Sequence, residues 1–96
     1  MKVMAIGTLK PLSPEQRQRY LPAEVPATLK LYLDGKMEQF WLREGEAGVI
    51  FLMSVESVDE ADRLLKALPL GRAELLTFEL MPVGPLLPLG MLMRSA

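Results

Sequence analysis

The sequence predicts one small α+β domain in which helices cover one face of an antiparallel β-sheet. Strand-like and helix-like segments follow one another in the order strand, helix, strand, strand, helix, strand. The length of 96 residues fits a single domain. Hydrophobic residues make up 50% of the chain, yet a chain this short buries only about 60–65% of its unfolded surface when it folds alone. We therefore expect apolar surface that a partner covers.

The first strand and the start of the first helix have clear local signals. Residues 2–9 form a mostly apolar run that stops at Lys10, which predicts a strand. Ser13, Pro14 and Gln16 have the pattern of a capping box with proline at the first helical position. This pattern predicts a helix that begins at residue 14.

Two prolines are expected to divide this first helical region. Pro22 and Pro26 lack an N–H donor, and each disfavours helical backbone in the residue before it. We expect a short helix over about 14–20 and a second helix over about 23–34, which Gly35 ends.

The middle of the chain predicts a β-hairpin. Residues 37–43 and 49–55 have strand composition, and the glycine-containing turn 44–48 joins them. Side chains alternate between the two faces of a strand, and the second of these strands is apolar on both. Val49, Phe51 and Met53 point one way, whereas Ile50 and Leu52 point the other.

An amphipathic helix and a last strand follow the hairpin. Ser57, with Glu60 three residues later, predicts the helix start. Pro69 and Gly71 are expected to end the helix, and residues 73–81 predict the strand. The apolar stripe of the helix consists of Val58, Ala61, Leu64, Leu65 and Leu68.

This order of elements is the ferredoxin-like βαββαβ arrangement, an antiparallel sheet with both helices on one face. A sheet with one solvated face alternates apolar and polar residues along its strands. Because residues 49–55 are apolar on both faces, something other than the helices should cover the second face. We predict a homodimer packed sheet to sheet.

The chain is expected to divide into a domain over residues 1–84 and an apolar C-terminal arm over residues 85–96. The arm would be exposed and adhesive if left in water, so we expect it to dock on a partner subunit. Its prolines and glycines interrupt the longest charge-free stretch, residues 80–93, which therefore does not predict a membrane span. We expect a cytoplasmic protein with no membrane partner.

The composition excludes several classes of function. Eleven basic and 12 acidic residues give a net charge of -1, which argues against a nucleic-acid partner. The chain contains no cysteine and no histidine, so thiolate chemistry, imidazole bases and the usual ligands of transition metals are missing. We predict no metal site and no cofactor.

The predicted architecture resembles the dimeric α+β barrel superfamily, and within it the muconolactone isomerase-like branch. The resemblance covers about residues 24–85. It is carried by Gly35-Lys36, Trp41, Gly45, Val55, Ser57-Val58, Leu68-Pro69-Leu70, Phe78-Glu79 and Pro82.

This resemblance implies a small-molecule ligand, assembly into rings beyond the dimer, and isomerisation of a small unsaturated lactone or a related carbonyl compound. Such a reaction needs a base and a donor that stabilises an enolate-like intermediate. Gln39 and Glu46 stand where enzymes of this branch carry histidines, which argues against muconolactone itself as the substrate.

Six residues are candidates for the site. Gln39, Trp41 and Arg43 share one strand face, which is either a ligand-orienting wall or a packing surface. Glu79 is either a base or a structural charge on a strand, and Glu24 is either a base or a helix-end charge. Tyr32 is either a ligand contact or part of the core. As catalytic residues we predict Glu79, Glu24 and Arg43, and as ligand-binding residues Trp41, Gln39 and Tyr32.

Two other functions fit the same sequence. One is a non-catalytic module for ligand binding or oligomerisation, which predicts a pocket without a base. The other is a cofactor-free monooxygenase of the same superfamily, which predicts oxygen uptake with an electron-rich aromatic substrate.

Overall fold

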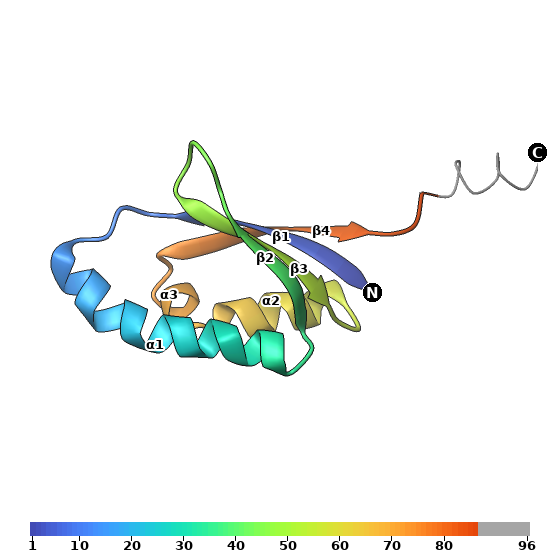
Figure 1. The fold of residues 1–96 in the computed structure, drawn as a ribbon, viewed down its shortest axis with the longest axis horizontal. Coiled ribbons are helices and arrows are strands. Elements are labelled where there is room, and N and C mark those ends of the chain that lie inside the picture. The colour runs from blue at the N-terminus through green and yellow to red at the C-terminus, as the bar shows by residue number, and fades with distance from the viewer. Residues whose placement is uncertain (87–96) are drawn as a thin grey trace, which may run out of the picture.

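The computed structural model describes residues 1–86 as a four-stranded antiparallel sheet with helices packed on one face (Figure 1). The predicted ferredoxin-like α+β fold is thereby confirmed. The elements in chain order are β1 (Lys2–Leu9), α1 (Pro14–Leu33), β2 (Met37–Leu42), β3 (Gly48–Ser54), α2 (Val58–Lys66), α3 (Pro69–Arg72) and β4 (Leu76–Val83). The predicted arm, residues 85–96, lies outside the described residues except for Pro85 and Leu86.

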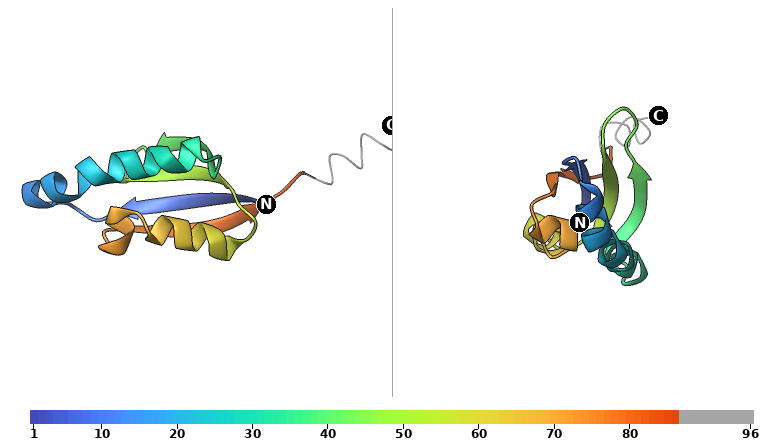
Figure 2. Two further views of the ribbon diagram at one scale, coloured as in Figure 1. Left: turned by 90° about the horizontal axis from the view of Figure 1, so that it is seen from below. Right: turned by 90° about the vertical axis from the view of Figure 1, so that its left-hand side faces the viewer.

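The sheet has the strand order β2-β3-β1-β4, so β2 and β4 are its edges. Directly paired residues point to the same face, and Val3 pairs with Met53 while Ala5 pairs with Phe51. These four side chains are buried against the helices. The opposite face, which we call the open face, carries no helix in the described part of the chain (Figure 2). Its apolar side chains include Met4, Ile6, Trp41, Ile50, Leu52 and Met81.

Helix α1 is continuous from Pro14 to Leu33, so the predicted break into two helices is wrong. Each internal proline removes one hydrogen bond of the helix. Both Pro22 and Pro26 lie on the exposed side, where water can satisfy the free carbonyl groups. The buried side, formed by Glu24 and Leu31, holds the helix against the rest of the domain.

The ends of α1 follow their sequence signals. Ser13 and Gln16 form the predicted reciprocal capping box. At the other end, the Gly35 N–H donates to the Tyr32 carbonyl at 3.1 Å, and the Lys36 N–H donates to the Leu31 carbonyl at 2.9 Å. This is a Schellman motif, and the φ of +78° at Gly35 is the left-handed conformation that it requires.

Helix α3 was not expected, because Pro69 and Gly71 predicted only an end of the preceding helix. Pro69 instead occupies the first position of a new short helix, where its missing N–H costs nothing. Glu74 ends α3 with a φ of +59° and with the Schellman hydrogen bonds that glycine usually makes. Strand β4 therefore begins at Leu76 and continues through Pro82 to Val83, which an edge strand permits.

An ion pair joins α2 to the start of β2. Ser57 caps α2 as predicted, but the Glu60 carboxylate accepts from the Lys36 ammonium at 3.1 Å instead of closing a capping box. The hydrogen bond from Lys36 lowers the pKa of Glu60, against an opposing effect of partial burial. A carboxyl group with a lowered pKa in the folded state stabilises the fold at neutral pH, and this contribution is lost as the pH falls through that pKa.

We therefore expect the Glu60→Gln variant to be less stable than the wild type at neutral pH, with the gap closing on acidification. Urea unfolding at about pH 7 and about pH 3, on either side of the ordinary carboxyl range, measures this gap. Glu44→Gln, at an exposed turn position, is the control and should leave the gap near zero throughout. A gap for Glu60→Gln that stays constant between the two pH values would contradict the assignment.

Candidate functional site

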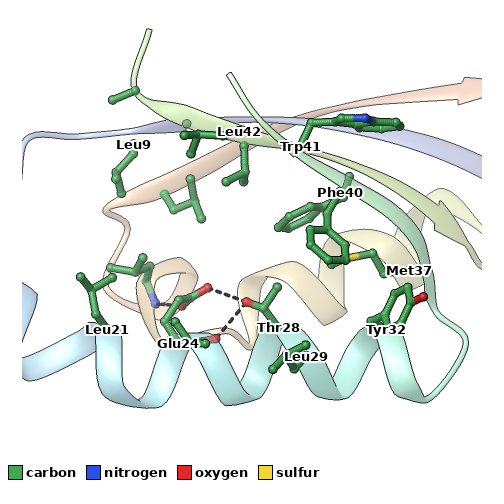
Figure 3. A pocket seen from close by; sticks show the side chains of 17 residues that line it. Leu9, Leu21, Glu24, Thr28, Leu29, Tyr32, Met37, Phe40, Trp41 and Leu42 are labelled. Atoms are coloured by element: carbon green, nitrogen blue, oxygen red, sulfur yellow. Dashed lines mark hydrogen bonds between the residues drawn. The ribbon is translucent and has the colours of Figure 1, made fainter. Parts of the chain in front are cut away.

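A cavity of about 850 Å³ lies between α1 and β2 on the helix side of the sheet (Figure 3). Its wall is almost entirely aliphatic and aromatic, and Glu24 is its one charged lining residue. The α1 side contributes Leu21, Glu24, Val25, Thr28, Leu29 and Tyr32, and the sheet side contributes Met37, Phe40, Trp41, Leu42, Val49 and Phe51. A large apolar cavity with a few polar groups has the character of a small-molecule site.

Glu24 is the buried polar group of this cavity, with an exposed fraction of 7%. Its Oε1 accepts from the Leu70 N–H at 2.8 Å, and its Oε2 accepts from the Thr28 hydroxyl at 3.3 Å. Leu70 is the second residue of α3, whose N-cap residue Leu68 supplies no side-chain cap. Glu24 thus caps α3 from a different helix, and its carboxylate is held in place by groups on both sides.

Thr28 lies one turn after Glu24, with its hydroxyl 2.9 Å from the Glu24 carbonyl oxygen as well. Tyr32 lies a further turn along α1, and its ring meets Phe40 of β2 edge to face at 5.6 Å between centroids. The polar groups of the cavity therefore form one row along α1, from Glu24 to the phenol of Tyr32. The sequence analysis named the two ends of this row and missed Thr28, whose spacing of four residues from each end was the available signal.

The other predicted site residues lie on the open face. Gln39 pairs with Leu52 and Trp41 pairs with Ile50, which places both side chains on that face. Trp41 also borders the cavity, although its indole extends to the side of β2 away from α1 (Figure 3). The structure thus groups Glu24 with Tyr32 and Trp41 at the cavity, apart from Gln39.

Glu79 lies on the open face of edge strand β4, opposite Ile6 of β1. Two strands separate it from β2, about 14 Å at the usual strand spacing. Arg43 forms an ion pair with Glu46 at 2.7 Å. The structure therefore does not bring Glu79 and Arg43 together within one chain.

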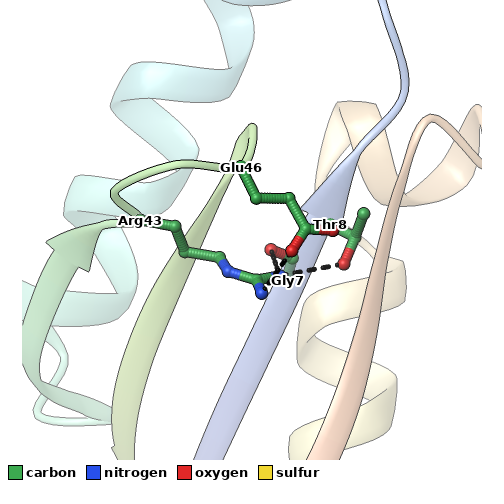
Figure 4. Close-up of polar contacts among 4 residues, drawn as sticks. All are labelled: Gly7, Thr8, Arg43 and Glu46. Carbon is green, nitrogen blue, oxygen red and sulfur yellow. Dashed lines mark hydrogen bonds and ion pairs between the residues drawn. The ribbon is translucent and has the colours of Figure 1, made fainter.

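Arg43 extends from the end of β2 across β3 toward β1 (Figure 4). Its Nη1 donates to the Thr8 hydroxyl at 3.1 Å and to the Gly7 carbonyl at 3.3 Å. Gly48 lies beneath this side chain, and a Cβ there would stand 3.0 Å from the Arg43 Cδ. The arginine thus ties the hairpin turn to the centre of the sheet, which is a structural role in the isolated chain.

No group of three or more acidic side chains within residues 1–86 has an arrangement that could hold a metal ion. In the same range, none of the helices is long and apolar enough to cross a lipid bilayer.

Comparisons with known proteins identify solved structures that have a similar fold. No family model matches the chain, and no curated protein matches it significantly. Muconolactone isomerase is similar in structure, with a TM-score of 0.75 at 20% identity over 88% of this chain and 90% of that one. A second similar structure is 5-chloro-2-hydroxyhydroquinone dehydrochlorinase from Burkholderia phenoliruptrix AC1100 in complex with 2,5-dihydroxybenzoquinone. Its TM-score is 0.70 at 18% identity, over 88% of this chain and 94% of that one.

These matches extend over most of both chains, although the sequence identities are only 18% and 20%. They confirm at the level of the fold the resemblance that the sequence indicated. The chain adopts the α+β fold that muconolactone isomerase and the dehydrochlorinase share.

Proposed function

We propose that the cavity between α1 and β2 binds a small, largely apolar carbonyl compound, and that the protein catalyses a cofactor-independent proton shift on it. The observation that carries this proposal is the position of Glu24, a single carboxylate held by two hydrogen bonds in an otherwise apolar cavity. A small unsaturated lactone is the substrate class that we favour.

The proposed reaction needs no redox partner. The carboxylate of Glu24 removes a proton from the carbon next to the carbonyl group, and the electron pair of that C–H bond moves to the carbonyl oxygen as an enolate. The same carboxyl group returns the proton at the far end of the conjugated system, so the double bond moves and no electrons are lost. The Thr28 hydroxyl, which donates to the Glu24 carbonyl oxygen at 2.9 Å and to its carboxylate at 3.3 Å, orients the base at the wall of the cavity.

Two features support this class of chemistry. The structurally similar enzymes are named for an isomerisation and a dehydrochlorination, both of small molecules. Tyr32, two turns or about 12 Å along α1 from Glu24, bounds the far end of the cavity and limits the length of the ligand. In this proposal Tyr32 contacts the ligand inside the cavity, and Trp41 borders the cavity from β2 with its indole directed to the open face.

Glutamine at position 24 is expected to lower turnover at least 100-fold. Glutamine keeps the acceptor oxygen for the Leu70 N–H, so the fold is retained while the base is lost. The measurement is deuterium incorporation from D₂O into unsaturated γ-lactones, followed by NMR for the wild type and Glu24→Gln. Glu44→Gln, which does not line the cavity, is the matched control. Undiminished exchange by Glu24→Gln would remove Glu24 from the mechanism.

Glu79, Arg43 and Gln39 belong to a rival placement of the reaction. They would act only on a ligand held between the open faces of two chains. Loss of exchange in Glu79→Gln together with full exchange in Glu24→Gln would favour that placement.

A non-catalytic ligand-binding role is the second candidate. The capping of α3 favours this role, because both carboxylate oxygens of Glu24 already accept hydrogen bonds, one from the Leu70 N–H and one from the Thr28 hydroxyl. Lactone binding that protects the protein against heat, without deuterium exchange, would identify this role.

We also infer that two chains pack through their open faces. Apolar side chains of that face, including Met4, Ile6 and Leu52, are bordered by the Lys2–Glu38 ion pair and by Arg43 with Glu46, and they would form the core of an isologous interface. Such a dimer would bury apolar side chains that a single chain of this length and composition cannot bury on its own.

A further inference from the structure

The cavity between α1 and β2 is larger than a bare lactone ring requires. Its volume of about 850 Å³ lies within the range of about 300–1,000 Å³ that is usual for the binding of a drug-sized ligand. A lactone ring alone would fill only a small part of this space. A ligand that fits the cavity therefore carries a substituent beyond the reacting ring.

The side chains that such a substituent would meet are apolar and only about half covered in the single chain. Leu29 and Tyr32 of α1 have exposed fractions of 49% and 46%, and Phe40 of β2 has one of 53%. Phe40 pairs with Phe51, which is buried on the helix side of the sheet, so both rings lie on the side of α1. Figure 3 shows Leu29 between Glu24 and Tyr32 along the helix. An alkyl group in this part of the cavity would bury apolar surface against both α1 and β2.

The charge of the cavity wall limits what else the ligand can carry. Of the lining residues, which all lie in the described part of the chain, none is a lysine or an arginine, and Glu24 is the one charged side chain. A carboxylate on the ligand would lose its hydration in this apolar space and would meet a like charge at Glu24 without a compensating cation. The wall therefore disfavours an anionic ligand.

A cationic ligand is also disfavoured. The two carboxylate oxygens of Glu24 already accept hydrogen bonds from the Leu70 N–H and the Thr28 hydroxyl, so an ammonium group would have to share these acceptors. The loss of hydration from a buried ammonium group is large, and a buried ion pair regains it only when its geometry is excellent. The cavity wall is therefore suited best to an uncharged ligand with an apolar substituent.

We propose that the ligand of this cavity is an uncharged lactone with an alkyl substituent. Its carbonyl end lies beside Glu24, and its alkyl group extends along α1 past Leu29. Tyr32 and Phe40 enclose the end of the alkyl group. This inference rests on the proposed function, which supplies the lactone ring, and it adds the substituent, its direction in the cavity and the exclusion of lactones that bear a carboxylate.

Saturated γ-lactones test the ligand without the reaction, because they have no double bond to move. Calorimetric titration of the wild type with γ-valerolactone, γ-hexalactone, γ-octalactone and γ-decalactone compares methyl, ethyl, butyl and hexyl substituents. We expect the dissociation constant to fall about fourfold with each added CH₂ group. An analogue of γ-octalactone whose butyl group ends in a carboxylate is expected to bind at least about tenfold more weakly than γ-octalactone itself.

A cation placed beside the alkyl group should reverse the preference against the carboxylate. Leu29→Arg is expected to strengthen the binding of the carboxylate-bearing analogue at least about tenfold and to weaken the binding of γ-octalactone. The matched control is Leu33→Arg, which adds the same charge at an exposed position of α1 that does not line the cavity. This control is expected to leave both dissociation constants unchanged.

Equal affinity for the four γ-lactones, or no binding of any of them, would overturn the proposal, and so would tighter binding of hexylamine than of γ-decalactone. Equal effects of Leu29→Arg and Leu33→Arg would place the binding outside the cavity and overturn it as well. The proposed function fails separately. Affinity that rises with chain length, without deuterium exchange in unsaturated lactones, would support this inference and reject the catalytic role. Exchange in short unsaturated lactones, with affinity independent of chain length, would do the reverse.

Discussion

Replacing Gly48 with alanine is expected to lower the free energy of unfolding by about 3–5 kcal/mol, a large fraction of the about 5–15 kcal/mol that is typical of a native protein. The φ of +154° at Gly48 is one that side chains rarely allow. A Cβ there would also stand 2.0 Å from the Gly7 carbonyl oxygen, which belongs to the central strand and cannot move aside without breaking the sheet. The substitution would therefore separate β3 from β1 at the point where Arg43 ties them together.

Gly45, in the same turn, provides the matched control. Its φ is +79°, and a Cβ there would meet nothing within 4 Å. Alanine at position 45 should cost only the left-handed backbone penalty of about 1 kcal/mol. Urea unfolding of both variants at one protomer concentration measures the difference. Equal losses of stability at the two positions would mean that the close contact with Gly7 is not the cause.

Replacing Leu52 with aspartate is expected to weaken the proposed dimer at least 100-fold, about 2.7 kcal/mol. Leu52 lies on the open face between Met4 and Gln39, away from the core between the sheet and the helices. An isologous interface would bury the new carboxylate twice, once from each chain, without a partner charge. Each chain should stay folded on its own, because its helix-side core is unchanged.

Sedimentation equilibrium at micromolar concentration measures this effect. The wild type should sediment at twice the chain mass of 10.7 kDa or, where dimers assemble into rings, at a multiple of that dimer mass, and Leu52→Asp should sediment at a lower mass. The control is Leu33→Asp, which places the same change on α1 at a side chain 79% exposed. A Leu52→Asp protein that stays a dimer would exclude the open face as the interface.

Signals that act over a few residues predicted most of the fold. The capping box at Ser13, the cap at Ser57 and the Schellman glycine at Gly35 all form as expected, because their hydrogen bonds join neighbours in the chain. The strand positions were right within a few residues, since alternation and apolar content reflect burial directly. The resemblance added the superfamily, which the structural matches support at the level of the fold.

The predictions that were wrong came from rules that consider only neighbouring residues in the sequence. Pro22 and Pro26 do not break α1, because their side of the helix is solvated while Glu24 and Leu31 hold the other side. Helix α3 forms after Pro69 because a carboxylate from another helix caps it. Neither the solvation of the prolines in α1 nor the capping of α3 by Glu24 can be predicted from the residues next to these prolines or to Pro69.

The sequence by itself determined the α+β class, the strands and helix ends, and the absence of histidine and cysteine chemistry. Only the tertiary structure decided which candidate residues share a site. The sequence predicts both Glu24 and Glu79 as catalytic residues. In the structure the sheet lies between them, because Glu24 lines the cavity on the helix side and Glu79 lies on the open face. The physical reason is that side-chain direction within an element follows from local periodicity, whereas proximity between elements depends on how the sheet pairs and which face the helices cover.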